Sequence, residues 1–408
     1  MMHESPCFAK PKNRRWRLDA IGWDANSKHI VIINLLPVSR FILSLLLLFL
    51  PAGASFAANT DLAATTGEPG LSLSNLRSVD VMKYTKDVMT HQPDDARIAS
   101  LIAALKSLHI THIAIAIPLD ADEDYPAGDK PAPRSARDFT QKWADAIHAQ
   151  GLHVLWRGTW SGLEGLYHFP KRVGNDRFPA GTAKSAPTDG NATWLGKTYR
   201  YIVEHPGFFA NGDLWAPLPE RTEYIFQDAT SFLPHDGGIQ QNYTDFFRDL
   251  KQVSESAFAK IGKQVRCGLS ANNYTEVKNG WLPQEFFDAQ GVIVVDYYGS
   301  SRTPEELEAD IRQMHARYGK PVFIQEWSDF WHSQTSLPER SAYLRQIYAR
   351  LQKLANDGIL VGFNYWGGWD NTTESIVVEN ETGFHLNYRG KLLQEFFKQC
   401  GKAAAQAD

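Results

Sequence analysis

The chain has 408 residues, 43% of them hydrophobic and 22% charged, which suits one large globular domain or two ordinary ones and excludes a disordered chain. The formal net charge is -4, and no cationic patch follows residue 57, so the composition does not predict nucleic-acid binding. Twelve Trp and fifteen Tyr are many, and they suit either a packed core or platforms for sugar rings.

The stretch RFILSLLLLFLPAGASFAANT, which begins at Arg40, has the pattern of a secretory signal peptide. A cationic start precedes an apolar run over 41–50, and Ser55 and Ala57 occupy the small-residue positions of a cleavage site after Ala57. The run is too short for a stable membrane span. We therefore expect a secreted or periplasmic protein.

Residues 1–39 precede this signal-like stretch, and signal peptides do not normally carry so long a segment before them. A translation start further along the chain, or an uncleaved N-terminal membrane anchor, are the alternatives. The leader 1–57 carries seven Lys/Arg and three Asp/Glu, so the remaining chain has a formal net charge of -8.

Residues 58–74 are rich in Ala, Thr, Gly and Ser and predict a linker, and residues 401–408 predict a short tail. Between them, over 75–400, short apolar runs alternate with longer amphipathic segments. The eight runs that predict strands are 78–84, 111–120, 151–158, 212–220, 264–273, 291–299, 321–329 and 358–371.

Four of the intervening helices can be predicted from their ends and their apolar spacing, at 94–107, 135–150, 304–318 and 338–356. The third has Thr303 at the N-cap position, Pro304 at the first helical position and two acids in its first turn.

Eight strand–helix units with nearly continuous apolar strands predict an α/β fold, a (β/α)8 TIM barrel. The first strand is not followed by GxGxxG, and GxxxxGK[ST] does not occur, so a dinucleotide or P-loop site is not predicted. Cys267 and Cys400 belong to no metal-ligand pattern, and the 13 His form no HxH or HExxH pair. We expect no metal and no cofactor, and either a Cys267–Cys400 disulfide or two buried thiols.

Chemistry in such a barrel lies at the C-terminal ends of the strands. Polar and aromatic residues gather at these predicted ends, as a sugar-binding cleft requires: Lys83, Tyr84, Asp87, Asp120, Trp156, Arg157, Trp215, Glu220, Asn272, Asn273, Tyr274, Asp296, Tyr297, Tyr298, Glu326, Trp327, Asn364, Tyr365, Trp366, Trp369 and Asp370.

Two of these carboxylates, Glu220 and Glu326, predict glycoside hydrolysis. That reaction needs an ionised nucleophile and a proton donor on either side of one bond. The ends of strands four and seven lie across the barrel mouth, close enough for the roughly 5–5.5 Å separation of a retaining mechanism.

The chain resembles the retaining glycoside hydrolases of clan A, the cellulase and mannanase type. Ile324–Trp327 resembles their nucleophile strand, Asp296–Tyr298 their strand six, and Phe363–Trp366 their strand eight. The resemblance implies that Glu326 is the nucleophile and that Glu220 is the acid/base. It also implies that Tyr298 bonds the nucleophile and that Trp366 forms the floor of the subsite at the cleavage point.

The chain departs from this pattern before Glu220, where much of the clan has an Asn that bonds the sugar 2-hydroxyl and this chain has Pro219. Either Asn273 or Arg157 supplies that bond, or a nearby acid, Glu223 or Asp228, replaces Glu220.

Each candidate also has a structural interpretation. Glu326 could be a buried acid in a salt bridge with Arg157, Glu220 a helix cap or a loop residue, Asn273 a turn residue, and Tyr298 barrel packing. We also expect five tryptophans to contact substrate: Trp156, Trp215, Trp327, Trp366 and Trp369.

The leading hypothesis is an exported, monomeric retaining glycosidase that cleaves a polysaccharide or oligosaccharide. A carbohydrate-binding barrel without catalysis is the second, because Pro219 occupies the Asn position. A transglycosylase or an aldolase-like lyase is the third, and a lyase would need Lys83 for a Schiff base.

Overall fold

The computed structural model describes residues 75–81, 93–118, 136–159, 194–217, 237–297, 303–329, 335–369 and 375–405. The predicted leader and linker lie outside these residues. Eight parallel strands form one sheet in the order β4-β3-β2-β1-β8-β7-β6-β5. The strands are β1 (Leu76–Asp80), β2 (His112–Pro118), β3 (His153–Thr159), β4 (Leu214–Trp215), β5 (Asn272–Asn273), β6 (Ile293–Asp296), β7 (Val322–Trp327) and β8 (Leu360–Tyr365).

The two end strands of this order are joined through the segment that precedes β5. Leu214 of β4 forms a parallel bridge with Arg266, and the backbone N–H of Trp215 donates to the Arg266 carbonyl at 2.8 Å. The sheet therefore closes on itself, and the predicted (β/α)8 barrel is confirmed.

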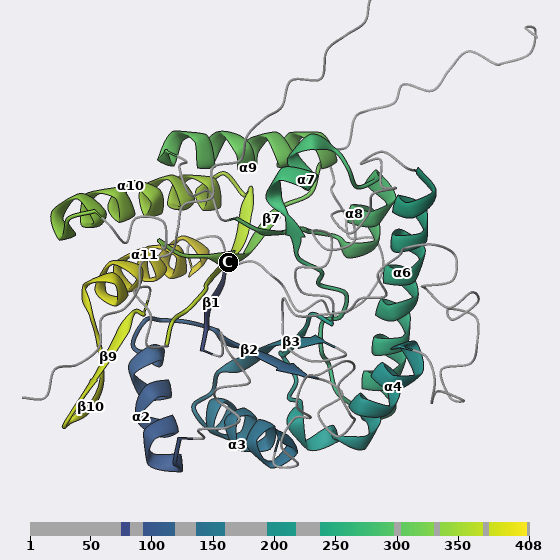
Figure 1. Ribbon diagram of the computed structural model, residues 1–408, viewed down its shortest axis with the longest axis horizontal. Helices are drawn as coiled ribbons and strands as arrows, with labels where there is room; N and C mark the ends of the chain where they lie inside the picture. Colours follow the sequence, from purple (N-terminus) through teal and green to yellow (C-terminus); the bar gives the residue numbers. More distant parts are fainter. Residues whose placement is uncertain are drawn as a thin grey trace, which may run out of the picture. The chain divides into compact units, whose positions relative to one another are not determined.

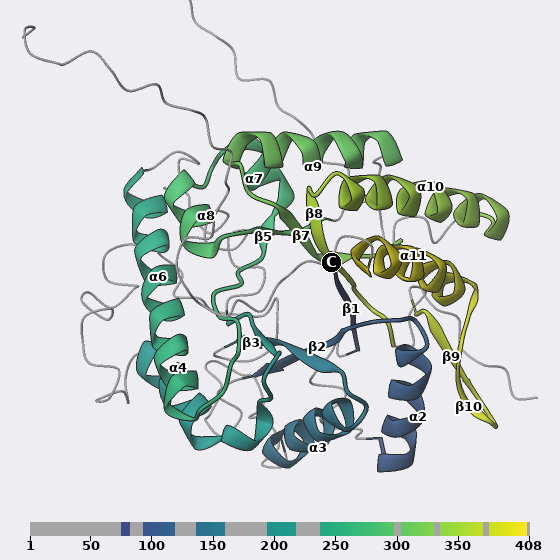
Figure 2. The same cartoon turned by 180° about the vertical axis from the view of Figure 1, so that it is seen from behind.

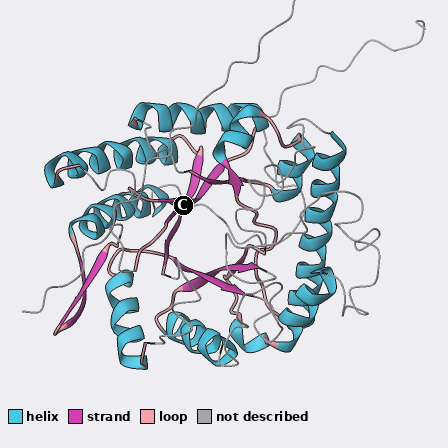
Figure 3. Ribbon diagram, in the orientation of Figure 1, coloured by secondary structure: helices cyan, strands magenta, loops and turns pink. Residues whose placement is uncertain are grey.

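The helices alternate with the strands and form a ring around them (Figures 1 and 3), which the view from behind shows equally (Figure 2). The four helices predicted from sequence are confirmed to within two residues. The helices are α2 (Asp95–Lys106), α3 (Ala136–Ala149), α4 (Trp194–Glu204), η1 (Pro206–Phe208), α6 (Gly237–Lys260), α7 (Tyr274–Asn279), α8 (Gln284–Gln290), α9 (Pro304–Tyr318), α10 (Leu337–Asn356) and α11 (Tyr388–Ala405).

Their ends follow from local chemistry. Thr303 and Glu306 form a capping box at the start of α9, and Ser336 and Glu339 form another at the start of α10. Among the residues described, no helix is long and apolar enough to cross a bilayer.

The alternation of strand side chains separates two apolar clusters. The buried faces of the helices pack on one cluster, which contains Val154 and Trp156 of β3. The other contains no helix residue and fills the barrel interior with Leu76, Ala114, Leu155, Leu214, Ala216, Leu269, Ala271, Val292, Val294 and Phe323.

A hairpin, β9 (Val377–Asn380) and β10 (Gly383–Leu386), follows β8 and was not predicted. It packs on α2, where the Phe384 N–H donates to Ser100 Oγ at 3.1 Å and Arg97 binds both carboxylate oxygens of Glu379.

Cys267 and Cys400 are both buried free thiols, so the structure has two separate thiols and not the disulfide. Cys400 lies on α11, which continues past the predicted end of the barrel to Ala405.

Candidate active site

The end of β7 carries an extra residue relative to both neighbouring strands. In the pairing with β6, Val295 lies opposite Ile324, but the next residue, Asp296, lies opposite Glu326. The pairing with β8 is irregular over the same residues. Such a bulge changes the direction of the side chains that follow it. Here the bulge at Gln325 accompanies a Glu326 side chain that reaches Arg157 of β3, across the barrel.

Three charged side chains meet inside the barrel at the C-terminal ends of β1, β3 and β7. Arg157 Nη1 donates to Asp80 Oδ2 at 2.7 Å, and Arg157 Nη2 is in direct contact with Glu326 Oε1. Arg157 and Asp80 are fully buried, and Glu326 is 2% exposed. A guanidinium in contact with a carboxylate favours its ionised form, which is the form that a nucleophile requires.

Further polar groups surround Glu326. Asp296 is 3% exposed on the adjacent strand, and the Tyr297 N–H donates to the Glu326 carbonyl at 2.9 Å. Asn364 of β8 donates from Nδ2 to the Gln325 carbonyl at 2.7 Å. Within the described part of the chain, the buried side-chain amide of Gln325 has no hydrogen-bond partner. The polar layer at this end of the barrel is therefore larger than one ion pair.

Asp80 was not among the predicted site residues. The sequence interpretation placed the first strand at 78–84 and its end at Lys83 and Tyr84, whereas β1 ends at Asp80. Asp80 is the only acid in that apolar run, and this was the signal that could have identified it. Asp296 was noted at a strand end but given no role.

Three of the predicted cleft tryptophans lie between the sheet and the helices. Trp156 donates to Asp213 Oδ2 at 2.9 Å, and Trp215 donates to Ser254 Oγ at 3.1 Å. Both are fully buried, and Trp327 is 3% exposed. Trp156 precedes Arg157 in β3, so alternation turns the two side chains to opposite faces of the sheet. A sugar platform needs an exposed ring face, whereas these three rings have the packing of core residues.

Trp366 and Trp369 follow β8 and are partly exposed. The Trp366 N–H donates to the Trp327 carbonyl at 3.0 Å. Trp369 lies 6.1 Å from Trp143 of α3 and beneath Arg97 of α2, whose guanidinium is 5.7 Å from the ring centre. Trp366, partly exposed directly after β8, therefore stays a candidate for the predicted floor of the subsite.

The remaining predicted residues separate into two groups. Asn273 caps α7, with Oδ1 accepting from the Thr275 N–H at 2.9 Å, which matches its alternative as a turn residue. Glu220 and Tyr298 lie outside the described residues. So do Lys83 and the two acids considered in place of Glu220, Glu223 and Asp228. Across the described ranges, no group of three or more His, Cys, Asp and Glu side chains could hold a metal ion.

No protein-family model matches the chain, and no curated protein matches it in sequence. Solved structures do resemble it. A Bacteroidetes-affiliated GH5 cellulase has 13% identity and a TM-score of 0.51, over 80% of this chain and 92% of that one. A β-glycosidase from Thermosphaera aggregans has 12% identity, covers 77% and 90%, and has a TM-score of 0.48.

A family 5 xyloglucanase from Paenibacillus pabuli has 14% identity, covers 75% and 90%, and has a TM-score of 0.44. At these identities the likeness shows the shared barrel fold alone, because one barrel fold supports many chemistries.

Proposed function

We propose that the chain is a retaining glycoside hydrolase in which Glu326 is the nucleophile and Glu220 is the acid/base. One observation carries the proposal: Glu326 is a buried carboxylate at the C-terminal end of β7, above a barrel interior filled with apolar residues. The fold shared with a GH5 cellulase supports this placement, since barrel enzymes have their chemistry at this end.

In the first step a Glu326 carboxylate oxygen attacks the anomeric carbon and forms an ester. The bond to the leaving oxygen breaks, and that oxygen takes the proton of Glu220. In the second step water attacks the anomeric carbon, Glu220 accepts the water proton, and the ester bond to Glu326 breaks. The products are two sugars, and both carboxyl groups return to their starting states.

The substrate class in this proposal is a polysaccharide or oligosaccharide, met by a monomeric protein after export through the predicted signal peptide. N-terminal sequencing of protein recovered outside the cytoplasm tests the export part. A mature protein that still carries residues 41–57 contradicts cleavage after Ala57.

The reaction is tested with the full chain and dinitrophenyl glycosides of glucose, mannose, xylose and cellobiose in both anomeric forms. We expect one of them to be hydrolysed and Glu326→Gln to lower kcat about 10³-fold or more. Azide should restore turnover of Glu326→Ala and give a glycosyl azide of inverted configuration. The same rescue of Glu220→Ala should give the retained configuration.

Glu326→Gln and Glu326→Ala remove a partner of a buried arginine, so either variant could fail to fold. A 2-deoxy-2-fluoro glycoside with the unaltered protein avoids this difficulty, because it traps the ester on the nucleophile. Mass spectrometry should then find the sugar on the peptide that contains Glu326. A trapped sugar on another residue overturns the assignment.

A carbohydrate-binding barrel without catalysis is the second candidate, favoured by the burial of Glu326 in its ion pair and by Pro219. It predicts that the unaltered protein binds glycans, hydrolyses none of the panel and forms no trapped ester. Equal binding by the unaltered protein and Glu326→Gln would decide for this candidate.

A further inference from the structure

We infer that Asp80 is a positioning residue that acts through Arg157: its carboxylate fixes the guanidinium against Glu326 and limits the positive charge that Glu326 receives. This inference rests on the proposed role of Glu326 as nucleophile. Asp80 holds one terminal nitrogen of Arg157 at 2.7 Å, while the other terminal nitrogen contacts Glu326.

The backbone of Asp80 is held as firmly as its side chain. The Gly368 N–H donates to the Asp80 carbonyl at 2.8 Å, and the Ile376 N–H donates to the Gly368 carbonyl at 3.1 Å. A Cβ atom on Gly368 would overlap Val79 Cγ1 and would lie 2.9 Å from the Asp80 carbonyl oxygen. The segment after β8 therefore packs directly on β1, and the carboxylate of Asp80 extends from a fixed point.

One guanidinium, that of Arg157, is bound by two buried carboxylates at this end of the barrel. Among the described residues, Asp80 and Glu326 both bind this guanidinium, and Asp296 is a third buried carboxylate at the end of a neighbouring strand. Asp329, three residues after Glu326, is bound by Arg389 at 2.8 Å on the helix side of the sheet. Two carboxylates thus share the charge of Arg157, so each receives less stabilisation of its ionised form than it would alone.

Sharing of this kind matters for a nucleophile. A carboxylate that a cation stabilises fully is a weak base and a poor nucleophile, and one without a cation is protonated too easily. Asp80 keeps Glu326 between these limits. Asp80→Asn preserves the shape and a hydrogen-bond acceptor but removes the competing charge.

The first test is the pH dependence of kcat/KM for Asp80→Asn, measured on whichever dinitrophenyl glycoside the unaltered protein hydrolyses. This leaving group departs without protonation, so the acid limb reports ionisation of the nucleophile. We expect the limb to move to lower pH by about one unit and kcat to fall about tenfold with little change in KM. A limb that stays in place, or that moves to higher pH, overturns the inference.

Asp213→Asn is the matched control for a purely structural loss. Asp213 is also a fully buried aspartate, but it lies at the start of β4, where it accepts from Trp156 and from the Val154 N–H. We expect it to lower thermal stability without moving the acid limb. The same limb shift in both variants would show a general effect of destabilisation and would also overturn the inference.

A second test needs no turnover. A double-mutant cycle of unfolding temperatures compares Asp80→Asn, Glu326→Gln and the variant with both changes. If Arg157 couples the two acids, the combined shift should differ from the sum of the single shifts by about 3 °C or more. Additive shifts overturn the coupling.

The two tests separate the inference from the proposed function. Coupled shifts in a protein that forms no trapped ester would retain the arrangement of Asp80 and Arg157 and reject the nucleophile. A trapped ester on Glu326 together with additive shifts would retain the nucleophile and reject the role of Asp80.

Discussion

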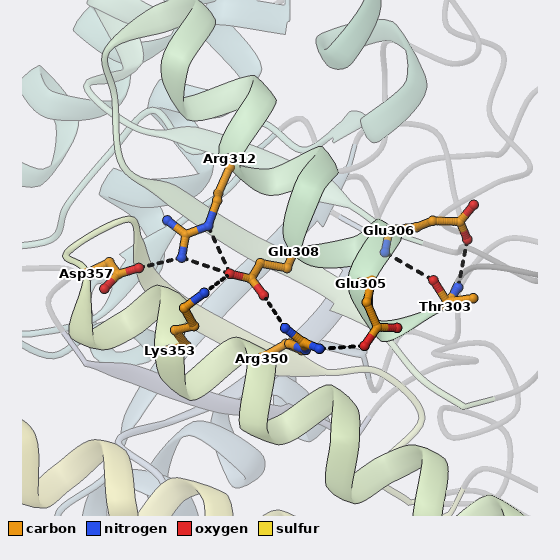
Figure 4. Close-up of polar contacts among 8 residues, drawn as sticks. All are labelled: Thr303, Glu305, Glu306, Glu308, Arg312, Arg350, Lys353 and Asp357. Carbon is orange, nitrogen blue, oxygen red and sulfur yellow. Dashed lines mark hydrogen bonds and ion pairs between the residues drawn. The ribbon is translucent and has the colours of Figure 1, made fainter.

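Glu308 joins the two helices on either side of the strand that carries Glu326. It lies on α9, before β7, and its carboxylate accepts from Arg312 of the same helix at 3.0 Å (Figure 4). From α10, which follows β7, it accepts from Arg350 at 3.0 Å and from Lys353 at 2.7 Å. The side chain of Glu308 is only 9% exposed. Replacing it by Gln should therefore weaken the packing of both helices.

The size of the effect follows from the charges. The hydrogen bond from Lys353, followed by those from Arg312 and Arg350, lowers the pKa of Glu308 from 4.5 to about 2. Without screening by water, this lowering of the pKa corresponds to about 3 kcal/mol in the free energy of unfolding. The three cations are between 34% and 57% exposed, so water screens them. We expect Glu308→Gln to lower the free energy of unfolding by about 1–2 kcal/mol near neutral pH.

The sign of the pH dependence is fixed by the lowered pKa. The contribution of Glu308 is present above its unfolded value of 4.5 and is lost as pH falls through about 2. Urea unfolding at neutral pH and low salt measures the loss. At about 1 M salt more than half of it should disappear, because the Debye length falls to about 3 Å.

Glu395→Gln provides the control, since Glu395 makes one exposed ion pair with Arg345 at 2.9 Å. A pair of this kind contributes about 0.5 kcal/mol or less. The reasoning is refuted if Glu308→Gln costs no more than Glu395→Gln at low salt, or if its cost does not depend on salt.

Two further predictions concern residues remote from the site. Burial raises the pKa of the Cys400 thiol to about 12, and Cys267 is buried as well. Both thiols should therefore resist alkylation in the folded chain and react within minutes in urea, which peptide mapping measures. Rapid labelling of either thiol in the folded chain would contradict its burial. Burial lowers the pKa of His112 from 6.5 to about 4, so its stabilising contribution is present above pH 6.5 and is lost as pH falls to about 4, by at most about 3 kcal/mol. The urea midpoint of His112→Asn should fall less over this range than that of the unaltered protein, and equal slopes would exclude His112 as the cause.

The strands could be predicted because a parallel sheet buries both faces and leaves nearly continuous apolar runs. The fifth strand differs from its prediction because a glycine interrupts it. The sequence predicted one element over 264–273, but Gly268 has a φ of +76°, which interrupts an extended strand. Only the bridge at Arg266 and the two residues of β5 remain. A glycine within an apolar run signals such a break without fixing its geometry.

The place of the candidate residue Glu326 in the fold was predictable, whereas the direction of its side chain was not. Glu326 follows from its place at the end of the seventh apolar run. The direction of its side chain does not, because the bulge at Gln325 depends on the register with β6 and β8. Trp327, the residue after Glu326, lies on the opposite face of β7, where its ring packs against Phe363 and Tyr348. The residues of β7 alone do not specify where its register with β6 and β8 shifts.

The structural and the catalytic interpretations of Glu326 share one contact, the ion pair with Arg157, so finding that contact does not choose between them. Burying charges costs free energy, and well-packed apolar residues usually brace strands at least as well. The barrel uses such residues lower in the same strands. The inward row of each of β1, β3 and β7 passes from an apolar residue to a charged one: Leu76 to Asp80, Leu155 to Arg157, and Phe323 to Glu326.

In the described parts of these three strands the inward charges lie at the C-terminal end, where barrel enzymes have their chemistry. Apolar residues there would hold the strands together at least as well. This distribution favours catalysis and makes the trapped ester the decisive measurement. A brace predicts that Glu326→Gln loses stability and that no ester forms on the unaltered protein, whereas a nucleophile predicts both the loss of stability and the ester.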